Sequence, residues 1–191
     1  MRRFFSSASF FALAAASALA LAAASFFAFC AAAAPYGLTG DLEFMPWTQV
    51  PDASTALRIV TAADQPNGRV LVDALHAGRS STTLADIAAI PAARLSYAQL
   101  CDAPAETPVT TEGLIHTARQ ARLLPGEGGI DLVGIFSQLP AELPVSVEVP
   151  HLERTAQLGV REWARQALAA ARVTLAARDA AVAKGASLRL E

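Results

Sequence analysis

Four short apolar runs in this 191-residue sequence each end in an oxygen-bearing side chain. These residues are Glu43 in Asp-Leu-Glu-Phe, Asp73 in Val-Leu-Val-Asp, Gln99 in Tyr-Ala-Gln-Leu and Glu148 in Val-Ser-Val-Glu. If the runs are parallel strands, their C-terminal ends share one face, where the active sites of α/β folds form. Three carboxylates gathered there repel one another, and an all-oxygen set suits Mg or Mn better than zinc. The four residues therefore predict a divalent-metal site.

Each of these residues also has a simpler interpretation. A single Asp or Glu at a strand end is more often a helix cap or a salt-bridge partner. Four consecutive strands that end alike are hard to explain in this way, because the side chains would lie buried and unpaired in apolar surroundings. The repetition favours a shared ligand.

A strand and helix alternation would bring these residues together. After Gly37, a short apolar or β-branched run is repeatedly followed by a turn and a helical pattern, which predicts parallel βαβ units. The expected strands cover residues 38–44, 69–73, 95–100 and 144–149, and the expected helices cover residues 52–63, 82–89, 130–139 and from 157 past 172. The connection from Cys101 to Gly129 is expected to be a long functional loop.

The first 34 residues differ in composition from the rest. Arg2 and Arg3 precede an uncharged, alanine-rich stretch, which is typical of a secretory signal and is also long enough to span a bilayer. The same stretch reads equally well as an Ala-rich helix that packs on a sheet. We therefore divide the chain into an apolar segment, residues 1–34, and an α/β domain, residues 35–191. We expect a cytoplasmic protein, or an exported or membrane-anchored one if the segment is a signal or an anchor.

Charge and cysteine content exclude several classes of protein. Fifteen Lys and Arg against seventeen Asp and Glu give a net charge of −2, and no basic block could neutralise a run of phosphates. Nucleic acid is therefore not an expected partner. Cys30 and Cys101 lack the spacing of a zinc knuckle or a disulfide scaffold, so both are expected to be buried thiols.

The candidate residues lie in motifs that resemble the sugar phosphate isomerase/epimerase family of xylose-isomerase-like TIM barrels, which includes ketose 3-epimerases and inosose dehydratases. The similarity covers about residues 35–175, and the motifs occur in the family's order and approximate spacing. They are Glu43 in Leu-Glu-Phe-Met-Pro-Trp, Asp73 and His76 in Asp-Ala-Leu-His, Gln99 followed by Asp102, Arg122 in Arg-Leu-Leu-Pro-Gly-Glu-Gly, and Glu148 in Val-Glu-Val. The ordered set is more specific than any single motif.

This resemblance implies a metal site and a reaction. The metal ligands would be Glu43, Asp73, Gln99 and Glu148, around a divalent ion such as Mn, Mg or Co. Gln99 stands where many members have histidine, which leaves the identity of the metal open. Glu43 and Glu148 would also be the acid and base that move a proton on and off a carbon next to a carbonyl.

Three further residues would contact a small sugar or polyol substrate. His76 would hydrogen-bond a substrate oxygen or the metal shell, Arg122 would clamp a substrate group with its paired donors, and Trp47 would form a wall. The structural alternatives are a capping histidine, a surface arginine paired with Glu127, and a core tryptophan.

Four βα units make only half of a TIM barrel, preceded here by the apolar N-terminal helix. In the family, four further units precede the equivalent of Glu43. Half a barrel leaves two open edges and, we expect, an exposed apolar inner face. Two copies could pair into a full circle as a homo-oligomer, the N-terminal helix could cover the gap, or the sequence could be truncated. We favour truncation, with loss of the substrate contacts from the missing strands.

The leading functional hypothesis is a metal-dependent sugar (phosphate) isomerase or epimerase that transfers a proton through a metal-stabilised enediolate. The same metal and base could instead expel a β-hydroxyl as water, as in inosose dehydratases, so a lyase is the alternative enzyme. A different class is a truncated, non-catalytic or exported fragment that only binds sugar. Membrane association is expected only if the N-terminal segment inserts.

Overall fold

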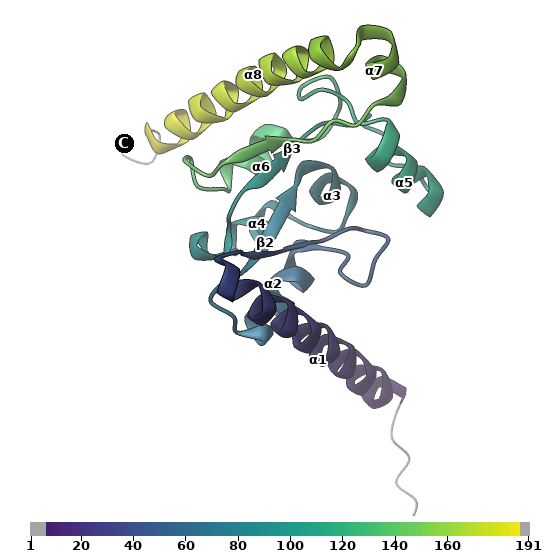
Figure 1. Ribbon diagram of the computed structural model, residues 1–191, viewed down its shortest axis with the longest axis vertical. Coiled ribbons are helices and arrows are strands. Elements are labelled where there is room, and N and C mark those ends of the chain that lie inside the picture. The colour runs from purple at the N-terminus through teal and green to yellow at the C-terminus, as the bar shows by residue number, and fades with distance from the viewer. Residues whose placement is uncertain (1–6, 188–191) are drawn as a thin grey trace, which may run out of the picture.

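The computed structural model describes residues 7–187, which form a four-stranded sheet with helices in its connections (Figure 1). The strands are β1 (Gly40–Glu43), β2 (Gly68–Asp73), β3 (Ala98–Leu100) and β4 (Val145–Val147). They are hydrogen-bonded in the order β1-β2-β3-β4, and every neighbouring pair is parallel. Parallel strands in sequence order with helices between them are half of a TIM barrel, so the expected fold class is confirmed.

Helices precede, connect and follow the strands. They are α1 (Ser7–Ala33), α2 (Ala53–Ala63), α3 (Ala74–Arg79), α4 (Leu84–Ala88), α5 (Thr111–Gln120), α6 (Leu132–Ser137), α7 (Leu152–Leu158) and α8 (Val160–Ser187). Short polar side chains fix where several of them begin: Asp52, Thr83 and Thr110 each accept a hydrogen bond from a backbone N–H in the first turn of α2, α4 and α5. The expected starts of α2 and α4 are thereby confirmed.

The connection after β3 is not the unbroken loop that we expected. Helix α5 occupies its middle, starting where the Thr110 hydroxyl accepts a hydrogen bond from the N–H of Gly113 at 3.1 Å. Ala118 is the one buried residue of this helix, and the prolines at 104, 108 and 125 on either side favour a loop in this part of the sequence. The last expected helix, from about residue 157, is α8, and Gly159, with φ +78°, separates it from α7, which was not expected.

The two faces of the sheet differ in chemistry. Val70, Val72, Ala98 and Leu100 are buried on the face packed against the core. Residues paired across parallel strands point to the same side, and the register pairs Glu43 with Leu71, Asp73 with Gln99 and Gln99 with Ser146. The opposite face, which we call the site face, therefore carries Asp41, Glu43, Arg69, Leu71, Asp73, Tyr97, Gln99 and Ser146. The expectation of an apolar inner face was wrong, because these side chains are mainly polar.

The end of α1 packs against the β1 edge of the molecule, whereas α8 packs on α6 and lies at the opposite end (Figure 1). Ala23, Phe26 and Cys30 of α1 are buried. A Cβ at Gly40 would lie 2.7 Å from the Cys30 Sγ, so the close approach of α1 to β1 requires glycine there. The segment Ala16–Tyr36 is also long and apolar enough to cross a membrane by length and composition. The domain boundary at residue 35 and the cellular location therefore stay predictions.

Candidate metal and catalytic site

The four candidate ligands lie at one edge of the site face. Glu43 and Asp73 are the last residues of β1 and β2, Gln99 is the middle residue of β3, and Glu148 directly follows β4. The N–H of Glu148 donates to the Leu100 carbonyl at 3.1 Å, so the backbone of β4 continues the parallel pattern as far as this residue. The C-terminal strand ends thus deliver all four side chains to one region, as the parallel sheet requires.

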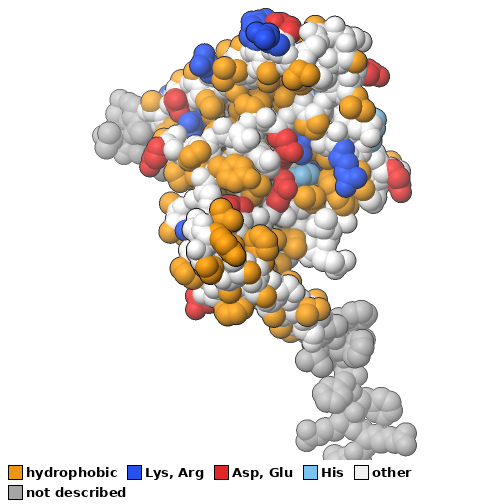
Figure 2. Space-filling view, viewed as in Figure 1, with side chains coloured by type: hydrophobic (Ala, Val, Ile, Leu, Met, Phe, Trp, Pro, Cys, Tyr) orange, Lys and Arg blue, Asp and Glu red, His pale blue; other side chains and the backbone are white. Residues whose placement is uncertain are grey.

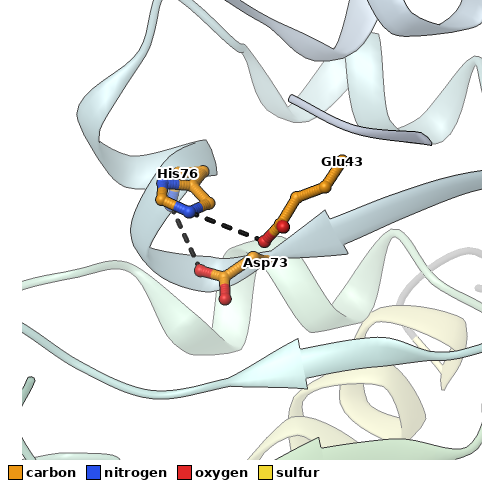
Figure 3. A group of neighbouring side chains, drawn as sticks. All are labelled: Glu43, Asp73 and His76. Carbon is orange, nitrogen blue, oxygen red and sulfur yellow. Dashed lines mark hydrogen bonds and ion pairs between the residues drawn. The ribbon is translucent and has the colours of Figure 1, made fainter. Parts of the chain in front are cut away.

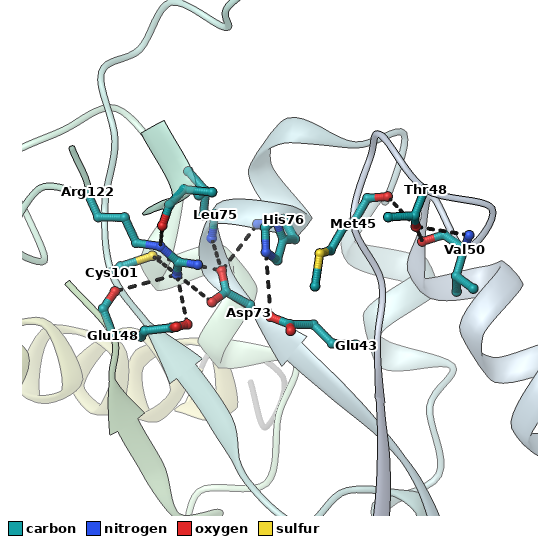
Figure 4. A network of polar contacts seen from close by, with 11 residues as sticks. Glu43, Met45, Thr48, Val50, Asp73, Leu75, His76, Cys101, Arg122 and Glu148 are labelled. Atoms are coloured by element: carbon teal, nitrogen blue, oxygen red, sulfur yellow. Dashed lines mark hydrogen bonds and ion pairs between the residues drawn. The ribbon is translucent and has the colours of Figure 1, made fainter. Parts of the chain in front are cut away.

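Asp73 is the centre of the polar network in Figure 4. Its carboxylate is fully buried. Oδ1 accepts hydrogen bonds from the N–H groups of Leu75 at 2.7 Å and His76 at 3.3 Å, which starts α3. Oδ2 accepts a hydrogen bond from Arg122 at 2.6 Å. Asp73 therefore acts as a helix cap and an ion-pair partner, and one lone pair on Oδ2 is left for a further ligand.

Arg122 is buried beside this carboxylate, with 3% of its surface exposed. Its Nε donates to the Ala118 carbonyl at 2.8 Å, and a terminal nitrogen lies 3.2 Å from Oε2 of Glu148. Burial by itself lowers the pKa of the guanidinium, but Asp73 outweighs it and raises the pKa above its usual range. The alternative of a surface arginine paired with Glu127 was wrong.

Glu43 and His76 face each other in Figure 3, with Oε1 of Glu43 3.5 Å from Nε2 of His76. The imidazole is 2% exposed and packs edge-on against Trp47, with ring centroids 5.1 Å apart. Burial lowers the pKa of His76 to about 4, so the ring is neutral at pH 7. Its Nδ1 has no hydrogen-bond partner within the described part of the chain.

Gln99 lies level with Asp73 on the next strand. Its side-chain oxygen, Oε1, is buried and has no hydrogen-bond partner among residues 7–187. An unpartnered buried amide oxygen is costly, because the group has lost its water and gained nothing in return. Such an oxygen is well suited to bind a cation as a ligand.

Negative charge exceeds positive charge at the site. Glu43, Asp73 and Glu148 carry three negative charges when ionised, Arg122 carries one positive charge and His76 is neutral, which leaves −2. Burial and the nearby Asp73 and Glu148 carboxylates raise the pKa of Glu43 to about 7. Glu43, Asp73 and His76 also offer ligand atoms that all lie within 4.8 Å of one another. The charge of the site therefore fits one divalent cation, and the spacing of Glu43, Asp73 and His76 fits a shared ion.

A cavity of about 340 Å³ opens beside these groups. Its lining residues are Glu43, Met45, Trp47, His76, Ala118, Arg119, Arg122, Glu148 and Pro150. Figure 2 shows acidic, basic and histidine side chains gathered near the middle of this face of the molecule. Met45 and Arg119 were not predicted as site residues. Arg119 belongs to the unexpected helix α5, and only that helix brings it to the cavity.

Asp102 shapes the loop beside the site. Its buried carboxylate accepts four backbone hydrogen bonds, from Ala103 at 2.8 Å, Gly126 at 3.0 Å, Gly128 at 2.9 Å and Ile130 at 3.1 Å. A Cβ at Gly128 would lie 2.4 Å from an Asp102 oxygen and closer still to a backbone carbonyl, so the loop closes around Asp102 only with glycine there. Asp102 belongs to a motif named above, but no role was predicted for it.

Comparison with known proteins decides the family. A family model described as xylose isomerase-like TIM barrel matches residues 7–172. The chain belongs to the xylose isomerase-like TIM barrel family. The match includes α1, so the family pattern reaches into the apolar N-terminal segment.

Individual relatives show how much of a longer protein the chain resembles. A 3-dehydroshikimate dehydratase from Pseudomonas aeruginosa is 31% identical over 121 residues, which is 61% of this chain and 18% of that enzyme. The chain thus matches less than a fifth of this curated relative.

Solved structures share the fold. The IolI protein, solved with a bound zinc atom, has a TM-score of 0.71 at 20% identity over 82% of this chain and 56% of its own. A xylose isomerase-like TIM barrel/4-hydroxyphenylpyruvate dioxygenase fusion protein has a TM-score of 0.60 at 24% identity over 66% of this chain and 20% of its own.

Proposed function

We propose that this site removes a proton from the carbon next to a carbonyl of a small hydroxylated substrate, with the help of a divalent metal, and that loss of water follows. The observation that carries the proposal is the meeting of three carboxylates, one guanidinium and an unpartnered amide oxygen at neighbouring strand ends. Structural salt bridges need no such excess of negative charge.

The proposed ligands are Glu43, Asp73, Gln99 and Glu148, with His76 beside Glu43. The charge of −2 and the unpartnered Oε1 of Gln99 support this assignment. Arg122 keeps Asp73 and Glu148 in place, because its guanidinium contacts both carboxylates. When bound, a divalent cation supplies a Lewis acid for the carbonyl oxygen.

Glu43 and Glu148 form the proposed acid and base pair. One carboxylate accepts the proton from the carbon next to the carbonyl, and the electron pair of the C–H bond moves towards the carbonyl oxygen. When the electron pair returns, the bond to the hydroxyl on the β-carbon breaks, and a carboxyl group of the pair supplies the proton with which the hydroxyl leaves as water. His76 and Trp47 contact each other and line one side of the cavity.

Dehydration is favoured over isomerisation by the name of the curated relative, a 3-dehydroshikimate dehydratase. Both reactions begin with the same proton abstraction, so the site face alone suits either. An isomerase or epimerase would return the proton to a neighbouring carbon or to the opposite face instead of releasing water. The proposed partner is therefore a small molecule, and the proposed location is the cytoplasm.

The test is an assay of the purified chain with Mn²⁺ and 3-dehydroshikimate. Loss of water from this ring gives an aromatic dihydroxybenzoate, which is followed by its ultraviolet absorbance. We expect Glu43→Gln and Glu148→Gln to lower the rate at least about 100-fold, the usual contribution of a general acid or base. Glu142→Gln, at an exposed position away from the cavity, is the matched control.

Two outcomes would count against this function. Product formation that is equal in wild type and in both glutamine variants would remove the two glutamates from the mechanism. Interconversion of a ketose with its epimer, without any release of water from 3-dehydroshikimate, would replace the dehydratase by an epimerase.

A further inference from the structure

A second arginine, Arg119, lines the cavity and has no acidic partner. It lies in the last turn of α5, three residues before Arg122, and its side chain is exposed. No carboxylate of the described chain forms an ion pair with it. Arg122, in contrast, is buried and holds Asp73 and Glu148. The guanidinium of Arg119 is therefore the one that is available to a ligand.

We propose that Arg119 binds a carboxylate of the substrate, so that the site selects anionic ring compounds over neutral sugars. This inference rests on the proposed function, because it concerns the substrate of the same site. A guanidinium presents paired N–H donors that match the two oxygens of a carboxylate.

Charge at the cavity supports this selection. The three carboxylates and Arg122 sum to −2, which one divalent cation neutralises. The charge of Arg119 is then left over, so the loaded cavity is positive by one unit. A neutral sugar leaves this charge unpaired, whereas a substrate with one carboxylate balances it.

The walls of the cavity also suit a ring with one charged end. Met45, Trp47, Ala118 and Pro150 supply apolar surface, and the polar groups of the metal site lie beside them. Arg119 is exposed and Arg122 is 3% exposed, which places Arg119 at the outer end of the cavity and Arg122 at its floor. A ring compound would therefore hold its reacting carbon near Glu43 and its carboxylate near the entrance.

The test is calorimetric binding of shikimate and of methyl shikimate to the Mn²⁺-loaded chain. The two probes share the ring and its hydroxyls and differ in the charge of the carboxyl group, and neither carries the ketone that the proposed reaction needs. We expect wild type to bind shikimate about tenfold more tightly than the ester, the usual strength of one charge-assisted hydrogen bond. Arg119→Gln should weaken shikimate binding about tenfold and leave ester binding unchanged.

Two further variants sharpen the test. Arg119→Lys should restore part of the preference for shikimate, because it keeps the charge without the planar fork. Arg172→Gln removes an exposed arginine of α8 that does not line the cavity, and it should change neither affinity. Metal content, measured on every variant, should stay at one equivalent.

The outcomes separate the inference from the proposed function. Three results, each in a chain that retains the metal, would overturn the role of Arg119 alone. They are equal affinity for acid and ester, no binding of either probe, and an unchanged preference for shikimate in Arg119→Gln. A wild-type chain that retains no divalent metal would overturn the proposed function, and this inference with it.

Discussion

Asp73 shows how one residue can hold a site together. Its two oxygens start α3, pair with Arg122 and face the proposed metal. A buried ion pair of this kind contributes little net stability, because both charges lose their hydration. Breaking it is nevertheless costly, because the remaining carboxylate is then buried without a partner. Arg122 is thus needed for the stability of Asp73 as well as for the charge of the site.

Replacement of this arginine gives the first prediction. Arg122→Ala should lower the free energy of unfolding by about 3 kcal/mol or more, because it leaves Asp73 buried and unpaired. Urea denaturation followed by circular dichroism measures this loss. Arg154→Ala, which breaks the partly exposed pair with Glu127, is the control and should cost less than about 1 kcal/mol. Equal losses in the two variants would contradict the burial argument.

Loops and caps position the site at the scale of elements. Asp102 pairs through its backbone with Leu123, the residue after Arg122, and its side chain binds the N–H groups of the following loop. The loop that carries Arg122 therefore depends on one buried carboxylate. Asp52 has a similar but more exposed role at the start of α2.

The second prediction concerns this loop. Asp102→Ala removes the acceptor of four backbone N–H groups and should lower the free energy of unfolding by about 3 kcal/mol. Asp131→Ala, which removes the cap of α6, should cost about 1 kcal/mol. Amide hydrogen exchange at Gly126 and Gly128 checks the cause, because their protection should fall in Asp102→Ala and remain in Asp131→Ala.

The third prediction is a pH dependence at the cap of α2. Burial alone would raise the pKa of Asp52, but hydrogen bonds from Thr55, Ser81 and Ser54 outweigh it and lower the pKa below its ordinary value of 3.8. The unfolded chain therefore binds the proton more readily, so the cap stabilises the protein above this value and the stabilisation is lost as the pH falls.

Asp52→Ala tests this sign directly. It should cost about 1 kcal/mol at pH 7 and clearly less at pH 3, as measured by urea denaturation at both values. Thr110→Ala removes an uncharged cap from α5, whose hydroxyl accepts a hydrogen bond from the Gly113 N–H, and it should cost the same at both pH values. A cost of Asp52→Ala that does not depend on pH would show that the carboxylate charge is not involved.

Considered as a whole molecule, half a barrel can be stable only if the sheet face that it leaves uncovered is polar enough to be solvated. The mainly polar site face meets this condition, because it exposes few apolar side chains where the missing half of a barrel would lie. The excess negative charge at its edge has the opposite effect and destabilises the metal-free chain. Metal binding should therefore stabilise the whole fold.

The fourth prediction follows from this coupling. A cation that binds only the folded chain adds about 2.7 kcal/mol at a free concentration of 100 times Kd, which is roughly 5–10 °C in Tm for a chain of this size. Mn²⁺ should raise Tm in a thermal scan, and EDTA should reverse the increase. Glu43→Gln should abolish the shift, and Glu142→Gln should keep it. A shift of the same size in both variants would place the cation elsewhere.

The number and order of the strands, and the starts of two helices, could be predicted from the amino-acid sequence. These features depend on local chemistry: the Asp-Leu-Glu run that ends in Glu43, the Val-Leu-Val run that ends in Asp73, and capping residues such as Asp52. Because parallel strands present the same end on one side, the order of the strands was enough to place the four candidate ligands at one edge of the sheet.

Which side chains meet at this edge depends on the packing of distant elements. Arg122 contacts Asp73 across 49 residues of sequence, and Trp47 packs on His76 from a different connection. The prolines that flank α5 favoured a loop there, so Arg119 could not be placed at the cavity in advance. Local spacing fixes which way a side chain leaves its own strand or helix, but its partner depends on how distant elements pack.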